Sequence, residues 1–217
     1  MDSAILQEEI LLIKNAKNDP EAFGELYDRY YPQIFRFVLT RTGNYELAQD
    51  LTAETFFQAL KSIWRFRLRN KTPFSSWLYK IAIAQISNFY RKKSSYCELS
   101  MEECPEIINR PDSASTENSA DYVFDKNLEF QEIFKLLQKL KPIHQNILTL
   151  RYFEEKTFEE ISVILGMKIN TAKSHHRRAL NGLREIIKES NHSLTSIFHE
   201  RRIEKNSAAS QGNQSTA

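Results

Sequence analysis

Glycine, proline and cysteine are scarce in this 217-residue chain, with 5, 6 and 2 residues respectively. An all-β protein with many tight turns would need more glycine and proline, so the composition favours helices. Cys97 and Cys104 lie in a polar, acidic stretch that has no C-x-x-C motif. They therefore provide neither a disulfide framework nor a tetrahedral zinc site.

Long apolar runs are also lacking. No N-terminal segment resembles a signal peptide, and no segment approaches the roughly 20 apolar residues that a membrane-spanning helix requires. Hydrophobic residues make up 41% of the chain and aromatic residues 12%, which is enough for a buried core. We therefore expect a cytoplasmic protein without membrane insertion.

The net charge of +2 conceals a segregation of charge along the chain. Residues 1–60 contain 10 acidic and 5 basic side chains, whereas residues 61–93 contain 9 basic side chains and no acidic one. Residues 94–125 have 8 acids and one base, and residues 166–188 have six Lys or Arg against one Glu. Two basic blocks separated by an acidic connector suggest two contacts with one polyanion, although two solvated helix faces would have the same composition.

Apolar periodicity predicts helices on both sides of a polar segment. Asp19 followed by Pro20 is a strong helix start, and this helix should end at Gly43, with a bend or break at Pro32. Further helices are expected over residues 4–17, 44–62, 74–91, 128–140 and 142–152. Residues 205–217 have the composition of a disordered tail.

The fold class predicted by these patterns is all-α, with two small helical domains joined by a flexible acidic linker. We expect the first domain to comprise residues 1–93 and the second to comprise residues 125–190. Residues 94–124 lose periodicity and form the linker, and residues 191–217 form the tail.

The second domain contains the pattern of a helix-turn-helix. Thr157 and Glu160 form a capping box before an apolar helix face, and Gly166 stands where a left-handed C-cap is needed. Asn170 can cap a second, basic helix, which in such motifs enters the major groove of DNA. Its candidate contacts with phosphates and base edges are Thr171, Lys173, Ser174, His175, Arg177 and Arg178.

The adjacent His175 and His176 raise the alternative of a metal site. Neighbouring side chains on a helix point about 100° apart, and no Cys, Asp or Glu stands three or four residues further on. We therefore expect no metal and no other cofactor. Helical phase instead predicts that His175 faces solvent or DNA and that His176 is partly packed.

Both domains together resemble a bacterial RNA polymerase sigma factor of the sigma-70 family, extracytoplasmic-function (ECF) group. In the first half, AFGELYDRYYPQIFRF, LAQDLTAETFFQAL and FSSWLYKIA are similar to sigma region 2. In the second half, LKPIHQNILTLRYFEEKTFEEISVILGM and TAKSHHRRALNGLRE are similar to sigma region 4. The resemblance implies a protein without catalytic chemistry that binds core RNA polymerase, directs it to −10 and −35 promoter elements and helps to melt the duplex.

The resemblance also implies particular contacts in the first domain. Region 2 of the family docks on the coiled coil of the polymerase β′ subunit, and the matching positions here are Asp50, Leu51, Glu54 and Phe57. Acids four residues apart share one helix face, which suits Arg or Lys of a partner. The other implied partners are the polymerase β subunit, promoter DNA and an anti-sigma factor.

Residues 64–93 interleave aromatic and basic side chains, and the resemblance gives this block a role at the −10 element. Basic groups follow a nucleic-acid backbone, and exposed rings can stack on unpaired bases for about 1–3 kcal/mol each. In the family, the loop matching residues 65–72 captures a flipped base. The expected −10 contacts are Arg65, Phe66, Arg67, Arg69, Lys71, Lys80, Asn88, Arg91 and Lys92.

Lys168 occupies the usual Ser or Thr cap position of region 4, so the recognition helix is expected to start later, at Asn170. The alternative function is a helix-turn-helix regulator that acts without replacing sigma and binds its operator unaided. An enzyme is disfavoured, because the chain lacks a glycine-rich phosphate loop, a metal-ligand cluster and a nucleophile motif.

Overall fold

The computed structural model describes residues 3–67, 73–99 and 128–189, and the regular elements within these ranges are helical. The first group consists of α1 (Ser3–Asn15), α2 (Pro20–Thr42), α3 (Tyr45–Ser62), the 3₁₀ turn η1 (Ile63–Arg65) and α4 (Phe74–Leu99). The second consists of α6 (Leu128–Gln138), α7 (Pro142–Leu148), the π-helical turn η2 (Thr149–Phe153), α8 (Phe158–Leu165) and helix 169–189. The prediction of an all-α fold is confirmed.

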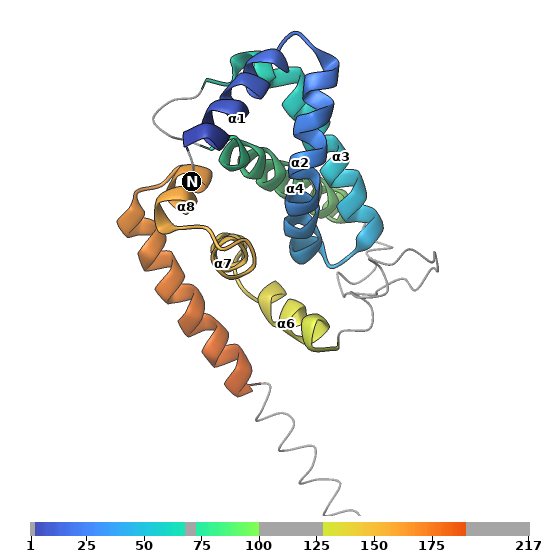
Figure 1. Ribbon diagram of the computed structural model, residues 1–217. Coiled ribbons are helices and arrows are strands. Elements are labelled where there is room, and N and C mark those ends of the chain that lie inside the picture. The colour runs from blue at the N-terminus through green and yellow to red at the C-terminus, as the bar shows by residue number, and fades with distance from the viewer. Residues whose placement is uncertain (1–2, 68–72, 100–127, 190–217) are drawn as a thin grey trace, which may run out of the picture.

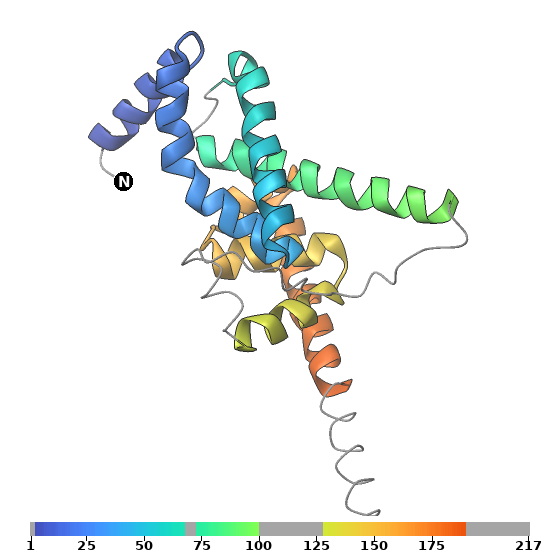
Figure 2. The same cartoon turned by 90° about the vertical axis from the view of Figure 1, so that its right-hand side faces the viewer.

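The first group, α1–α4, surrounds an aromatic-rich core. Helices α2 and α3 lie side by side, while α4 packs against both of them (Figures 1 and 2). The ring of Tyr30 lies 5.3 Å from that of Phe74, and Phe37 meets Tyr79 edge-on at 5.2 Å. This packing fixes the orientation of the outer faces of α3 and α4. No helix in the described ranges is long and apolar enough to cross a membrane.

The ends of α2 follow from local sequence. Asp19 accepts a hydrogen bond from the Glu21 N–H at 2.9 Å, and Gly43 ends the helix with φ of 64°. Sequence analysis predicts a bend or a break at Pro32, and the structure has no break there, because α2 continues through this residue. Pro32 is exposed, so the carbonyl that its missing N–H leaves free can bond to water.

Two other predicted boundaries differ from the structure. Helix α4 extends to Leu99, six residues into the predicted linker, whereas residues 100–124 and the 205–217 tail lie outside the described residues. The recognition helix already begins at residue 169, because Lys168 O accepts from the Ala172 N–H at 3.0 Å. Asn170 therefore lies in the first turn and is not the cap.

The two groups of helices pack against each other. Helix α8 lies on α4, while η2 and α6 lie on α2 (Figure 1). One hydrophobic cluster extends from the core of the first group to Ile147, Leu150, Ile161 and Ile164 of the second. The sequence patterns predict two domains joined by a flexible linker and give no sign of this contact.

Alanine substitutions at Gly43 and Gly166 can be compared to measure how much the contact between the end of α2 and Phe134 of α6 stabilises the fold. Both are left-handed C-caps, with φ of 64° and 65°, but a Cβ on Gly43 would overlap the Phe134 ring of α6. A Cβ on Gly166 would meet no atom within 4 Å.

We expect Gly166→Ala to lower the free energy of unfolding by about 1 kcal/mol, which is the backbone cost alone. Gly43→Ala should lower it by at least about 2 kcal/mol, because the ring must also move. Urea unfolding followed by circular dichroism measures both values. Equal losses would contradict the contact between Gly43 and Phe134.

Candidate nucleic-acid and protein interfaces

The outer face of α3 is acidic and apolar. Asp50 is exposed, and Glu54, one turn later, is half-buried and accepts from Gln58 Nε2 at 2.7 Å. The Phe57 side chain is 49% exposed, with Lys61 Nζ 3.9 Å from its ring centre. Two carboxylates one turn apart, followed by an open aromatic ring, suit a partner that offers basic and apolar side chains together.

Leu51, the fourth residue predicted on this face, is turned about 100° from Asp50 around the helix axis and points into the core. It is buried in the core with Ala48 and Phe56. Its role is to hold α3 against the neighbouring helices, so that Asp50 and Glu54 face outward.

The segment after α3 presents two arginines around a buried ring. Arg65 and Arg67 are exposed, whereas Phe66 is 6% exposed and packs against Phe74 and Trp77, with ring centres 5.2 and 5.0 Å away. The Phe66 carbonyl accepts from Lys17 Nζ at 2.9 Å. In this arrangement Phe66 anchors the segment, and its ring is not free to stack on a base. Arg69 and Lys71 lie outside the described residues.

A hollow of about 340 Å³ adjoins this segment. Its lining carries three cations, two aromatic rings, one hydroxyl and one aliphatic side chain, namely Arg65, Arg67, Lys80, Phe66, Trp77, Ser76 and Val163. The first six residues come from the first group of helices, and Val163 comes from α8. Positive charge beside the half-buried Trp77 ring suits a nucleic-acid base with its phosphate.

The basic face continues along α4 from Lys80. Arg91 and Lys92 are exposed, and Asn88 is half-buried and accepts from Arg91 Nη2 at 3.0 Å. Lys80, Asn88 and Arg91 recur at helical spacing, so they form one line of donors on α4. Such a line can follow a phosphate backbone.

The helix-turn-helix forms as the sequence predicts. The Glu160 N–H donates to Thr157 Oγ1 at 3.2 Å, and the Thr157 N–H donates to Glu160 Oε2 at 2.9 Å, which completes the capping box. Gly166 then turns the chain into helix 169–189, whose Ala172 and Ala179 are fully buried. Of the predicted contact residues, Thr171, Lys173, Arg177 and Arg178 are exposed in its first turns, and Ser174 is half-buried.

The two histidines both make contacts within this second group of helices. His176 Nε2 lies 3.0 Å from the Tyr152 hydroxyl, and its ring meets Phe158 edge-on at 5.2 Å. His175 is also half-buried, with Nδ1 3.5 Å from His144 Nε2 of α7. The expected partial packing of His176 is confirmed, but His175 is not simply solvent-facing, because α7 lies against it.

Two histidines of this second group of helices, His144 and His176, have a lowered pKa in the folded protein. Burial lowers the pKa of His144, and the neighbouring basic groups His175, Lys141 and Arg178 lower it further. Burial, followed by the charge of Arg151, lowers the pKa of His176. Both rings therefore favour the neutral form in the folded protein.

We expect the helix-turn-helix to lose stability as the pH falls below about 6.5. The folded-state pKa of His144 and His176 is lowered, so the unfolded chain binds more protons there, and the stabilisation present above this pH is lost. Melting temperatures between about pH 8 and 5.5 should fall less in the His144→Gln, His176→Gln double variant than in the wild type. Equal falls in the two proteins would contradict this assignment.

Comparison with known proteins identifies the class to which this arrangement belongs. Residues 26–96 match the family described as Sigma-70 region 2, and residues 136–185 match Sigma-70, region 4. These ranges contain the α3 face, the basic face of α4 and the helix-turn-helix.

Individual relatives agree with this match. The chain is 30% identical to the RNA polymerase sigma factor YlaC of Bacillus subtilis over 73% of this chain and 88% of YlaC. It is 27% identical to the ECF RNA polymerase sigma factor BldN of Streptomyces coelicolor over 86% of this chain and 67% of BldN. The fold is similar to that of the sigma factor RpoE from Bartonella quintana, solved in complex with the anti-sigma factor NepR, with a TM-score of 0.59 and 22% identity over 76% of this chain and 96% of RpoE.

The chain belongs to the sigma-70 family of RNA polymerase sigma factors, in the ECF group. It directs RNA polymerase to promoters and has no enzymatic activity of its own. The prediction from the sequence is confirmed at this level. The match to region 2 runs from within α2 to near the end of α4, and the match to region 4 runs from the end of α6 into helix 169–189. For brevity, α1–α4 are called region 2 below, and α6 to helix 169–189 are called region 4.

Proposed function

We propose that this sigma factor docks on core RNA polymerase through the outer face of α3, with Asp50, Glu54 and Phe57 against the β′ coiled coil. The observation that supports this best is the open, acidic and apolar surface of α3. Carboxylates on such a surface gain charge-assisted hydrogen bonds from Arg or Lys of a partner. An additional contact of region 4 with the β subunit belongs to the same proposal.

Promoter recognition is assigned to the two basic surfaces. Arg65, Arg67 and Lys80 surround the hollow beside Trp77, which suits a flipped base of the −10 element, and Asn88, Arg91 and Lys92 extend the contact along α4. Helix 169–189 reads the −35 element through the exposed side chains of its first turns. Opening the duplex follows from capture of the flipped base, whose extrusion costs a few kcal/mol that the hollow offsets.

Each part of the chain is given a role in this proposal. Residues 1–93 bind polymerase and the −10 element, residues 94–124 connect the regions, residues 125–190 bind the −35 element, and residues 191–217 form a tail. The protein works in the cytoplasm, where polymerase and promoters are. An anti-sigma factor is proposed as a regulator, as for the RpoE relative that was solved with NepR.

Run-off transcription with core RNA polymerase and a genomic promoter library tests the proposal. Adding the protein to core enzyme should produce discrete transcripts whose start sites share −10 and −35 elements. A regulator that does not replace sigma would instead bind its operator unaided and give no new transcripts with core enzyme alone.

A further inference from the structure

Phe66, the buried residue between Arg65 and Arg67, makes a hydrogen bond with a side chain from a distant part of region 2. Lys17, which lies in the turn between α1 and α2, donates from Nζ to the Phe66 carbonyl at 2.9 Å. The two residues are 49 positions apart in the chain, and the bond is partly buried. A lysine that donates to the last carbonyl of a helical turn makes the same contact that stabilises the C-terminal ends of longer helices.

Phe66 is fixed through its N–H, its ring and its carbonyl. The N–H donates to the Ile63 carbonyl at 2.9 Å, and the backbone then becomes extended, with φ of −64° and ψ of 125°. The ring packs in the core against Phe74 and Trp77. A carbonyl at the end of a helical turn has no donor from the turn itself. Lys17 provides this donor, so it fixes the peptide unit between Phe66 and the residue that follows.

The turn that carries Lys17 is itself well fixed. The Ala16 N–H donates to the Leu12 carbonyl at 2.9 Å, and the Asp19 N–H donates to the Asn15 carbonyl at 3.0 Å. Ala16 is buried, and Asp19 is the N-cap of α2. The backbone from which the Lys17 side chain starts therefore keeps a defined place relative to both α1 and α2. Less conformational entropy is then lost when this long side chain forms its contact.

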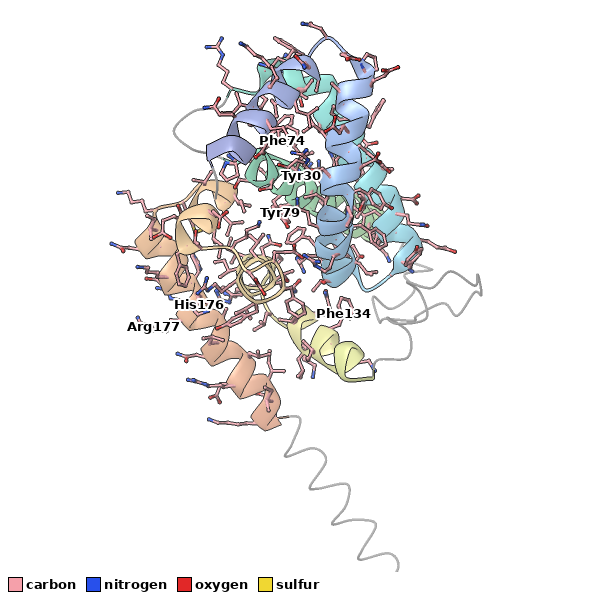
Figure 3. All side chains as sticks on the ribbon, viewed as in Figure 1. Tyr30, Phe74, Tyr79, Phe134, His176 and Arg177 are labelled. Carbon is pink, nitrogen blue, oxygen red and sulfur yellow. The ribbon has the colours of Figure 1, made fainter. Side chains whose placement is uncertain are left out.

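Helix α1 is attached to the same aromatic core that holds the Phe66 ring. Glu9 of α1 is buried and accepts from the Tyr30 hydroxyl of α2 at 2.5 Å. Burial and then the hydrogen bond to Glu9 raise the pKa of Tyr30, so its hydroxyl stays a donor. Tyr30 lies beside Phe74 (Figure 3), which is one of the two rings against Phe66. Helix α1 therefore supports Phe66 through the core and, by way of Lys17, through the backbone.

The residues on either side of Phe66 are the arginines of the hollow. Arg65 and Arg67 both line it together with Lys80, whereas Lys17 lies outside the lining that the described residues form. Lys17 is thus placed to act on a bound nucleotide through the arginines and not by touching it. Groups that recognise a ligand need to be held within about 0.5 Å of their productive position, and neighbouring residues supply this restraint.

We propose that Lys17 is a positioning residue for recognition of the −10 element. By holding the Phe66 carbonyl, it directs Arg65 and Arg67 toward the nucleotide that the hollow receives, and it contributes to the preference for one base without contacting DNA. The match to Sigma-70 region 2 begins at residue 26, so Lys17 and α1 precede it. This inference rests on the proposed function, which assigns the −10 element to the hollow.

Hydrogen–deuterium exchange of the free, full-length protein, followed by NMR, measures whether Lys17 holds the segment. Lys17→Met removes the ammonium and keeps an apolar stem, so it should raise the exchange rate of the Phe66 amide at least about tenfold. Lys17→Gln, which ends one bond closer to the backbone, should do the same. Lys14→Met is the matched control, because Lys14 is exposed on α1 and the same charge is removed. It should exchange like the wild type, as should the Phe37 amide in the core of every variant.

Competition binding of the holoenzyme to promoter fragments, varied at each position of the −10 element, measures the effect on recognition. Lys17→Met should lower the preference for the favoured base at one position by about fivefold or more, the lower end of what one base contact supplies. Lys14→Met and Lys17→Arg should keep the preference, and the preference at the −35 element should not change. The salt dependence of binding should be the same in Lys17→Met and Lys14→Met, because neither lysine is proposed to touch a phosphate.

Each result decides one step. A wild-type exchange rate of the Phe66 amide in both Lys17→Met and Lys17→Gln would overturn the claim that Lys17 holds the segment. Faster exchange with an unchanged base preference would overturn its role in recognition. A salt dependence that is shallower by about one unit in Lys17→Met alone would show that Lys17 contacts a phosphate directly, which contradicts a positioning role.

Failure of the proposed function would look different. If the wild-type holoenzyme has no base preference at the −10 element, the function assigned to the hollow is wrong. The exchange rates of the free protein still decide whether Lys17 holds the segment, because they are measured without polymerase or DNA.

Discussion

Replacing Asp50 and Glu54 with lysine should weaken binding to core RNA polymerase by at least about 100-fold. The two carboxylates are one turn apart on α3, Asp50 is exposed, and Phe57 continues the same face. Reversing both charges places two cations opposite the basic groups that this face is proposed to meet. Like charges at an interface cost several kcal/mol.

The fold should survive this change, because neither side chain belongs to the core. The control is Glu25→Lys with Asp28→Lys, which makes the same change of charge at two exposed positions of α2. Surface plasmon resonance with immobilised core polymerase measures both affinities, and thermal unfolding checks stability. If the Asp50 and Glu54 variant binds like the control, the docking surface is elsewhere on the protein.

Replacing Arg178 with alanine should weaken binding of the holoenzyme to the −35 element by about 1–3 kcal/mol, roughly 5- to 150-fold. Arg178 is exposed on helix 169–189, near the buried Ala179 that sets the orientation of the helix. An arginine that reads a guanine makes two hydrogen bonds to its O6 and N7, and loss of these bonds should relax the preference at one base pair.

Arg184→Ala is the control for this second change. Arg184 is exposed on the same helix, but it lies beyond the first turns, where base contacts are made. It should change affinity little, or equally for all sequences. Competition binding on a library of −35 variants, taken from promoters found by run-off transcription, gives the preference. An unchanged preference with a shallower salt dependence for Arg178→Ala would show that Arg178 touches only phosphate.

Much of the local structure could be predicted from the sequence. Asp19, Gly43, Thr157 and Gly166 mark helix ends where the structure has them. Capping depends on side chains three or four residues away, so it is contained in a short stretch of chain. The same locality explains the helix-turn-helix, whose basic residues and two buried alanines recur at helical spacing.

Predictions made from short stretches of sequence failed where water or a residue distant in the chain makes the contact that decides the local structure. Pro32 does not break α2, because its face is open to water, and Lys168 precedes helix 169–189 without offering a capping side chain. His175 meets His144 of α7, which phase along one helix cannot reveal. Phe66 is placed in the core by Phe74 and Trp77, although its basic neighbours suggest a DNA contact.

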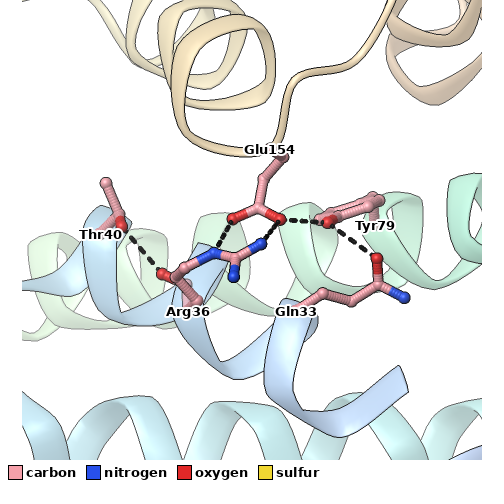
Figure 4. A network of polar contacts seen from close by, with 5 residues as sticks. All are labelled: Gln33, Arg36, Thr40, Tyr79 and Glu154. Atoms are coloured by element: carbon pink, nitrogen blue, oxygen red, sulfur yellow. Dashed lines mark hydrogen bonds and ion pairs between the residues drawn. The ribbon is translucent and has the colours of Figure 1, made fainter. Parts of the chain in front are cut away.

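The sequence by itself determined the family, the helices and the exposed positions of Asp50, Phe57, Arg177 and Arg178, since these depend on periodicity and on neighbouring residues. Only the tertiary structure decided how region 2 and region 4 meet. Arg36 and Glu154 are 118 residues apart in the chain and form an ion pair in the structure (Figure 4), and no local pattern of the sequence pairs them. Their pairing depends on the shapes of two folded surfaces, because a carboxylate becomes buried only once both surfaces have come together.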